Sequence, residues 1–160
     1  MRSNFVYWAG GLLVLLVVCL LGYRWQQNES RRQCLAALVD FRSALNSPDS
    51  ARLLAKIAIP AAIRGRTVQE QSEFVRKALR DEISEVGLRL IAQRGTFGPL
   101  AKIFPLEGLG WAQQAGVDLA NCTAFKIEDH GLRTEVVLEA RGNAYRIVRC
   151  NNVKQLAKGP

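Results

Sequence analysis

The feature that most constrains this chain is a long, uncharged and apolar run close to its start. The run covers Phe5 to Tyr23, which is 19 residues, and Arg2 and Arg24 stand on either side of it. As a helix it would be about 28 Å long, close to the thickness of the hydrocarbon core of a bilayer. Aromatic side chains stand at both of its ends, at the level where lipid headgroups favour them. The run therefore predicts a transmembrane helix over residues 5–23, with the lipid bilayer as a partner.

A cleaved signal peptide and a lipoprotein begin with the same pattern of charge followed by apolar residues. A signal peptidase site needs small residues after the run, where this chain has Tyr23 and Arg24. A lipoprotein would use Cys19, but the bulky Val18 precedes it and apolar residues follow it. The pattern thus favours an uncleaved, single-pass signal-anchor over these two alternatives.

The orientation of such an anchor depends on the charges that flank it. A short head with Arg2 is typical of an export signal, which predicts a bacterial inner-membrane protein with its C-terminal domain outside the cytoplasm. The positive-inside rule argues the other way, because Arg24, Arg31 and Arg32 follow the run. Both orientations stay open.

The rest of the chain predicts one α+β domain that a helix joins to the apolar run. No proline or glycine occurs between Tyr23 and Pro48, and apolar residues recur at spacings of three and four, which is typical of one helix over 27–45. Its stripe consists of Cys34, Leu35, Leu38, Phe41, Arg42 and Leu45. The expected organisation is a tail (1–4), a transmembrane helix (5–23), a juxtamembrane helix continuous with the domain (24–46), the α+β domain (47–155) and a second tail (156–160).

Prolines and capping patterns divide the middle of the chain into short helices. Ser47 and Pro48 are typical of a helix start, and Pro60 would end that helix. The capping box of Thr67 and Glu70 predicts a third helix. Its expected buried side consists of Phe74, Val75, Ala78, Leu79, Ile83 and Val86.

Two later segments are also predicted to be helical. The stretch Val86–Ile91 continues the helical pattern, but it also alternates with period two, so a short strand stays an alternative. Pro99 and Pro105 each stand where a helix can begin. Residues 106–115, which Gly116 follows, predict the last helix.

After residue 121 the period of the pattern changes to two, which predicts three antiparallel strands in a meander. Turn residues separate these strands at 129–131 and 141–143. One face of the sheet is apolar and needs the preceding helices as a cover, and it consists of Phe125, Ile127, Val136, Leu138 and Ile147. The expected fold class is α+β: an N-terminal transmembrane helix, several helices, and a C-terminal antiparallel sheet of three or more strands.

This order of a membrane helix, a long first helix and a terminal sheet resembles the NTF2-like or cystatin-like architecture of many bacterial membrane-anchored domains. The resemblance covers about residues 30–155 and rests on layout, with no motif that would transfer a site residue. The chain departs from that architecture in having three predicted strands instead of four or more, and in its helical middle region. The resemblance implies a shell used for binding or assembly at least as often as for catalysis.

Motifs that carry catalysis are missing from the sequence. The single histidine, His130, stands beside Asp129 in a predicted turn, where a solvated loop residue is a simpler interpretation than a general base. The sequence has no G-x-S-x-G, no Walker loop, no H-E-x-x-H and no G-x-G-x-x-G. We therefore expect no catalytic residue, no cofactor and no metal site.

Cys34, Cys122 and Cys150 lack the close spacing that places two thiolates on one metal ion. In an oxidising compartment they are candidates for a disulfide, with the pairing open. Three free, half-buried thiols are the alternative.

The net charge of +8 would suit nucleic acid if the charges gathered on one face beside stacking aromatic residues. In the final predicted strand, Arg146 and Arg149 have opposite parity, which predicts no single basic stripe. The sequence therefore argues against nucleic acid as a partner and indicates a general attraction to anionic lipid.

These observations favour a non-catalytic binding or assembly module whose partners are other membrane or periplasmic proteins. The candidate contact surface is Gly108 to Trp111 together with the exposed side of the sheet, because Trp111 is the one tryptophan outside the anchor region and aromatic residues are favoured at interfaces. Packing of Trp111 in the core is the alternative. Two other functions stay open: a small-ligand carrier or enzyme with a pocket between sheet and helices, and a subunit of a membrane secretion or conjugation complex.

Overall fold

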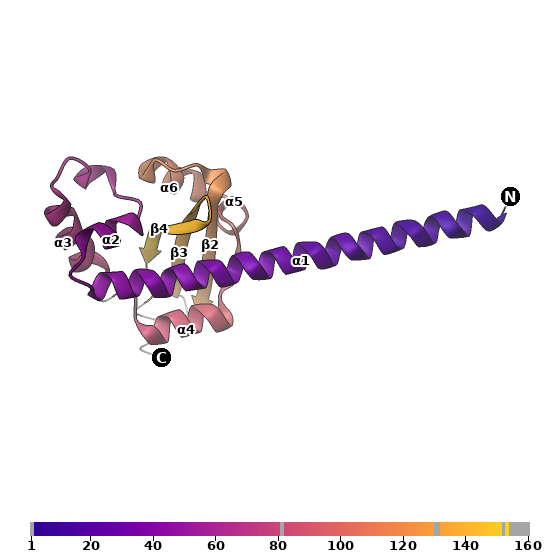
Figure 1. The fold of residues 1–160 in the computed structure, drawn as a ribbon, viewed down its shortest axis with the longest axis horizontal. Coiled ribbons are helices and arrows are strands. Elements are labelled where there is room, and N and C mark those ends of the chain that lie inside the picture. Colours follow the sequence, from indigo (N-terminus) through magenta and orange to yellow (C-terminus); the bar gives the residue numbers. More distant parts are fainter. Residues whose placement is uncertain (1, 81, 130–131, 152, 154–160) are drawn as a thin grey trace. The chain divides into compact units, whose positions relative to one another are not determined.

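The computed structural model describes residues 2–80, 82–129, 132–151 and 153, and it describes side chains from residue 14 onwards, except those of Asp129 and Leu132. The chain divides into two compact units, residues 1–32 and 33–160. Helix α1 (Arg2–Asn46) begins in the first unit and ends in the second (Figure 1). The other described helices and strands belong to the second unit.

The structure corrects the prediction of a transmembrane helix over residues 5–23. Within the described part of the chain, no helix combines the length and the apolar character that crossing a membrane requires. The predictions of a single-pass signal-anchor and of a bacterial inner-membrane location are corrected with it. The side chains of residues 5–13 lie outside the described ones.

Four antiparallel strands form one sheet in the order β1-β2-β3-β4. Their bounds are β1 (Thr96–Pro99), β2 (Cys122–Asp129), β3 (Leu132–Arg141) and β4 (Ala144–Asn151). The last three confirm the predicted meander, and Gly142 takes a positive φ of 57° in the turn between β3 and β4. The turn at 129–131 includes residues 130 and 131, which lie outside the described residues.

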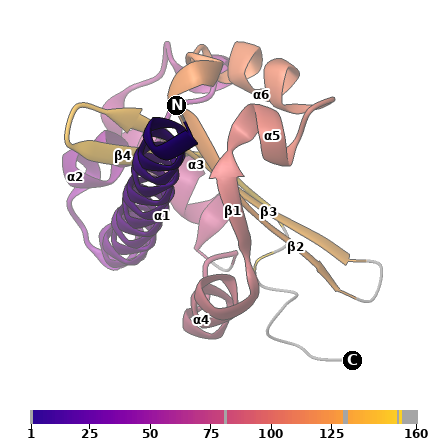
Figure 2. The same ribbon diagram turned by 90° about the vertical axis from the view of Figure 1, so that its right-hand side faces the viewer.

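Strand β1 was not predicted. It lies beside β2 (Figure 2), with Phe97 opposite Phe125 and Pro99 opposite Thr123. Glycine and proline make up half of this short segment, and both are poor strand formers. Pairing with β2, and not local preference, therefore makes the segment a strand.

Seven described helices that follow α1 pack around this sheet or lead into it. They are α2 (Ser50–Ala55), α3 (Val68–Leu79), α4 (Glu85–Arg94), α5 (Leu100–Ile103), α6 (Gly108–Ala115) and the 3-10 helix η2 (Leu119–Asn121), with a further short 3-10 helix, η1 (Ala61–Ile63), between α2 and α3. Helix α4 contains the whole of Val86–Ile91, so that segment is helix and not strand. Gly116 ends α6 as predicted, in the left-handed conformation with φ 66°.

Capping residues fix where α2 and α3 begin. Thr67 and Glu70 form the predicted capping box at the start of α3. Helix α2 begins after Asp49, whose carboxylate accepts the backbone N–H of Arg52 at 3.0 Å, and not after Ser47 as predicted. A carboxylate at this position also interacts favourably with the helix dipole.

The buried side of α3 differs from the predicted one. Val75 is buried beside the polar Gln71 and Ser72, whereas Phe74 is 45% exposed. The Gln71 amide donates to three carbonyl oxygens of the preceding loop at 2.9 to 3.1 Å, which compensates its burial. Since α3 ends at Leu79, the chain changes direction there and the helical spacing no longer predicts which later residues are buried.

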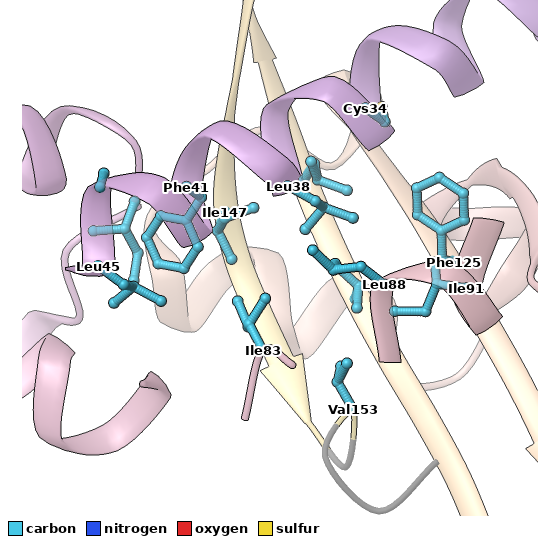
Figure 3. Packing of buried hydrophobic residues seen from close by; sticks show 14 of the residues in the cluster. Cys34, Leu38, Phe41, Leu45, Ile83, Leu88, Ile91, Phe125, Ile147 and Val153 are labelled. Atoms are coloured by element: carbon cyan, nitrogen blue, oxygen red, sulfur yellow. The ribbon is translucent and has the colours of Figure 1, made fainter. Parts of the chain in front are cut away.

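The core of the second unit lies on both faces of the sheet. On the first face, the five strand residues predicted to be apolar and covered are all buried. Figure 3 shows Leu38, Phe41 and Leu45 of α1 on the side of the helix that faces the sheet and α4. On the second face, α5 and its neighbours cover a smaller cluster that consists of Leu100, Phe104, Cys122, Ala124 and Val137.

Asp40 joins α1 to the end of α2 through two ion pairs. Its carboxylate lies 2.5 Å from Nζ of Lys56 and 2.8 Å from Nη2 of Arg52. The hydrogen bond from Lys56, and then that from Arg52, holds the pKa of Asp40 below its ordinary value. A carboxyl group whose pKa is lower in the folded state stabilises the fold above its unfolded pKa of about 3.9, and the contribution is lost as the pH falls through the folded pKa.

We expect Asp40→Asn to lower the free energy of unfolding at pH 7 by less than about 1 kcal/mol, because the ion pairs are partly exposed to solvent. The difference between variant and parent should shrink as the pH falls below about 4. Urea denaturation of both proteins at pH 7 and pH 3 measures this difference. A difference that grows toward acid pH would contradict the role of the ionised carboxylate.

Candidate functional site

Strand β4 places Arg146 and Arg149 on the same face of the sheet, so the predicted opposite parity is wrong. Leu138 lies opposite Ile147, but the neighbouring Val137 lies opposite Arg149, which leaves one extra residue in β4. Such a β-bulge restarts the alternation of side chains along a strand. The second face of the sheet therefore carries a row of charged side chains from β3 and β4. We call it the charged row, and it consists of Glu135, Glu139, Arg141, Arg146 and Arg149.

Two buried carboxylates hold the charged row together. Glu139 is 4% exposed, and its Oε2 accepts hydrogen bonds from Nε of both Arg141 and Arg146. Glu135 is 6% exposed and accepts Nε of Arg149 at 2.9 Å. A buried carboxylate is costly without such partners. The two glutamates therefore fix the positions of the arginines. Because each arginine is held through its Nε, its Nη groups are also fixed in place.

Trp111 lies half-buried where α6 meets the charged row. Its ring packs on Phe104 with the ring centres 4.9 Å apart, and the Arg149 guanidinium lies 4.5 Å from the centre of the Trp111 ring. Stacking of a guanidinium on an aromatic face is favourable and holds both groups in place. The sequence left two interpretations of Trp111, a contact residue and a core residue. Trp111 packs against the cluster on the second face and also keeps part of its surface exposed, so each interpretation is partly right.

The chain around Trp111 exposes two large apolar side chains. Leu106 is 90% exposed and Leu109 is 54% exposed, and the two are three residues apart at the start of α6. We call Leu106, Leu109 and Trp111 the α6 surface. The predicted contact segment 108–111 includes only two of these residues, because Leu106 precedes α6 in the turn after α5 and carries no motif.

Described residues of the second unit line two surface cavities that bear on function. The first has a volume of about 330 Å³, and its lining includes Arg64, Arg141 and Arg146. The second has a volume of about 500 Å³, and its lining includes Lys102, Lys126 and the carboxylate-bearing Glu128. Neither was predicted, because each is lined by segments that are far apart in the sequence.

All four cysteines are free thiols in the structure. Cys122 and Cys150 lie on strands that β3 separates, and their partners on β3 are three residues apart. Strand spacing then puts their Cα atoms about 14 Å apart, twice what a disulfide allows. Cys34 is buried against the first face of the sheet, whereas Cys122 belongs to the cluster on the second face. The structure does not gather the three thiols, and a disulfide stays a prediction.

Burial raises the pKa of Cys34 and of Cys122 to about 11 and that of Cys150 to about 12. A thiol with so high a pKa is almost entirely protonated at pH 8 and reacts slowly, since the thiolate is the nucleophile. We expect iodoacetamide at pH 8 to label the exposed Cys19 at least about tenfold faster than the other three, as followed by mass spectrometry. Labelling of any buried thiol at the rate of Cys19 would contradict this burial, and a mass lower by two hydrogens would reveal a disulfide.

The remaining candidates for chemistry are not supported by the described residues. His130 lies outside the described residues, and its assignment to a solvated loop stays a prediction. Among the described side chains, no three histidine, cysteine, aspartate or glutamate residues gather as metal ligands. What the second face does offer is a set of fixed arginines beside exposed apolar groups, an arrangement suited to binding.

Comparison of the chain with family models, with curated proteins and with solved structures finds no match.

Proposed function

We propose that this chain is a non-catalytic binding module that contacts a protein partner through the α6 surface. The observation that carries the proposal is the exposure of Leu106, at 90%, and of Leu109, at 54%, three residues apart in the sequence. Leaving two leucines in water forgoes the stabilisation that burial of apolar area gives, about 25 cal/mol per Å². Neighbouring apolar groups of this kind are typical of a surface that a partner covers.

The surroundings of the two leucines support the same function. Tryptophan and arginine are the residues that most often dominate binding energy at protein interfaces. Here Arg149 stacks on Trp111 and is itself held by Glu135 at 2.9 Å. Side chains that are already fixed lose little conformational entropy when a partner binds.

The buried carboxylates also favour binding over catalysis. Glu135 and Glu139 both accept hydrogen bonds from arginine guanidinium groups, which supports a positioning role for them. The two cavities are open to solvent, and the apolar cluster of the first face is filled by side chains. An enzyme or a carrier with an enclosed pocket between sheet and helices finds less support.

Site-specific photo-crosslinking of the full chain in its native cells tests this proposal. A photoreactive amino acid replaces Leu106 or Leu109 in two variants and Val68 in the control. Val68 is matched to Leu109, since it is an apolar helix residue that is 56% exposed, against 54% for Leu109. We expect both α6-surface variants to form the same discrete crosslinked species, and the Val68 variant to form none of it.

A second variant distinguishes a specific contact from nonspecific crosslinking. Leu106→Asp, combined with the photoreactive group at position 109, should remove the crosslinked species while leaving the urea denaturation midpoint unchanged. Absence of any crosslink at positions 106 and 109, or equal crosslinks at position 68, would refute a specific contact through the α6 surface.

A further inference from the structure

Three arginines from distant parts of the chain converge on the smaller cavity. Arg64 follows η1, Arg141 ends β3 and Arg146 lies in β4, and all three line the cavity of about 330 Å³. We call this the arginine cavity. It lies at the end of the charged row where Gly116 ends α6, and it is distinct from the α6 surface, with which it shares no residue.

Among the described residues, Arg64 is held in this cavity by backbone oxygens and has no carboxylate partner. Its Nε donates to the carbonyl of Ile59 at 3.1 Å, and its Nη2 donates to the carbonyl of Ala115 at 2.6 Å. A Cβ atom at Gly116 would lie 2.9 Å from Nη2 of Arg64, so a residue without a side chain makes room for the guanidinium. The charge of Arg64 is therefore positioned but not neutralised.

The other two arginines share one carboxylate. Nε of Arg141 and Nε of Arg146 both donate to the same oxygen of Glu139. The described lining of the arginine cavity includes no aspartate or glutamate. Among the described side chains that line the cavity or pair with its arginines, three guanidinium groups stand against one carboxylate, that of Glu139, which leaves a formal charge of +2.

We infer that the arginine cavity binds the phosphate group of a small phosphomonoester. A phosphomonoester carries close to two negative charges at pH 7, which matches the unpaired charge. Planar guanidinium groups bind phosphate oxygens through paired N–H donors, and Nη atoms of Arg141 and Arg146 are left for this when Nε holds Glu139.

The rest of the lining indicates what the phosphate is attached to. Leu54, Ile57 and Ile59 form an apolar wall beside the arginines. The volume is at the lower end of that found for pockets that bind small molecules, about 300–1,000 Å³. The cavity thus suits a phosphate on a compact apolar group, such as a single ring, better than a nucleotide or a long polyanion.

Calorimetric titration of the full chain with phenyl phosphate tests this inference. Phenol, which keeps the ring and lacks the phosphate, is the control ligand. Arg141→Gln is the test variant, and Arg89→Gln is its matched control. The Arg141 side chain is 62% exposed and that of Arg89 is 67% exposed, and each pairs with a glutamate. The denaturation midpoints of both variants are measured first, and both should equal that of the parent.

We expect phenyl phosphate to bind and phenol not to bind. Loss of one guanidinium donor to phosphate should weaken binding by about tenfold or more in Arg141→Gln, and Arg64→Gln should weaken it similarly, while Arg89→Gln leaves it unchanged. No detectable binding of phenyl phosphate, binding of phenol as strong as that of phenyl phosphate, or equal loss in Arg89→Gln would each overturn the inference. None of these results depends on whether the α6 surface contacts a protein.

Discussion

Replacing Phe41 with alanine is expected to lower the free energy of unfolding by about 3–5 kcal/mol, because it removes a whole ring from the core. Phe41 is fully buried, and Figure 3 shows its ring between α1 and the sheet. A total stability of about 5–15 kcal/mol is usual for a domain, so this variant should lose a large share of it. Urea denaturation followed by circular dichroism measures the change.

Val39→Ala on the same helix is the matched control. Val39 is 60% exposed, and its truncation should change the free energy of unfolding by no more than about 0.5 kcal/mol. The comparison tests which side of α1 faces the sheet. Similar effects at the two positions, or a larger effect at position 39, would show that α1 packs through another side.

Replacing Glu139 with alanine should lower the free energy of unfolding by about 3 kcal/mol, because it leaves the Arg146 guanidinium without its carboxylate. Both side chains are largely shielded from water, and that of Arg146 is 20% exposed. Glu128→Ala provides the contrast, since Glu128 is 61% exposed in its ion pair with Lys126 and should cost less than about 1 kcal/mol.

A double variant shows whether the loss comes from the uncompensated charge. Glu139→Met combined with Arg146→Met replaces the pair by apolar side chains of similar size and should recover most of the stability. If the double variant is as unstable as Glu139→Ala, the cause is lost packing or another contact of Glu139. Equal costs for Glu139→Ala and Glu128→Ala would also contradict the burial of the charged row.

Signals between residues close in sequence predicted much of the second unit. The capping box of Thr67 and Glu70 acts within one helical turn, and it starts α3 as expected. The spacing of apolar residues predicted that Leu38 and Phe41 of α1 are buried, and the period of two predicted β2, β3 and β4. Each of these patterns depends on contacts that the local backbone geometry already fixes.

Features that depend on distant partners could not be predicted in the same way. The bulge in β4 changes the face of Arg149, and nothing in the local sequence announces it. Strand β1 exists only through its pairing with β2. The arginine cavity requires that Arg64 meet the end of α6, through a hydrogen bond to Ala115, 51 residues later. The apolar run near the start gave the clearest local signal, and its interpretation as a transmembrane helix is corrected by the described residues.

That the second face of the sheet is a binding face is tested most directly by locating where a ligand binds. Arginine side-chain Nε–H signals of the full chain, recorded by NMR during titration with phenyl phosphate, report this residue by residue. We expect the signals of Arg64, Arg141 and Arg146 to shift together in a saturable manner, while that of Arg89 stays in place. Shifts confined to Arg94 in the larger cavity, or no saturable shift at all, would contradict ligand binding in the arginine cavity on this face.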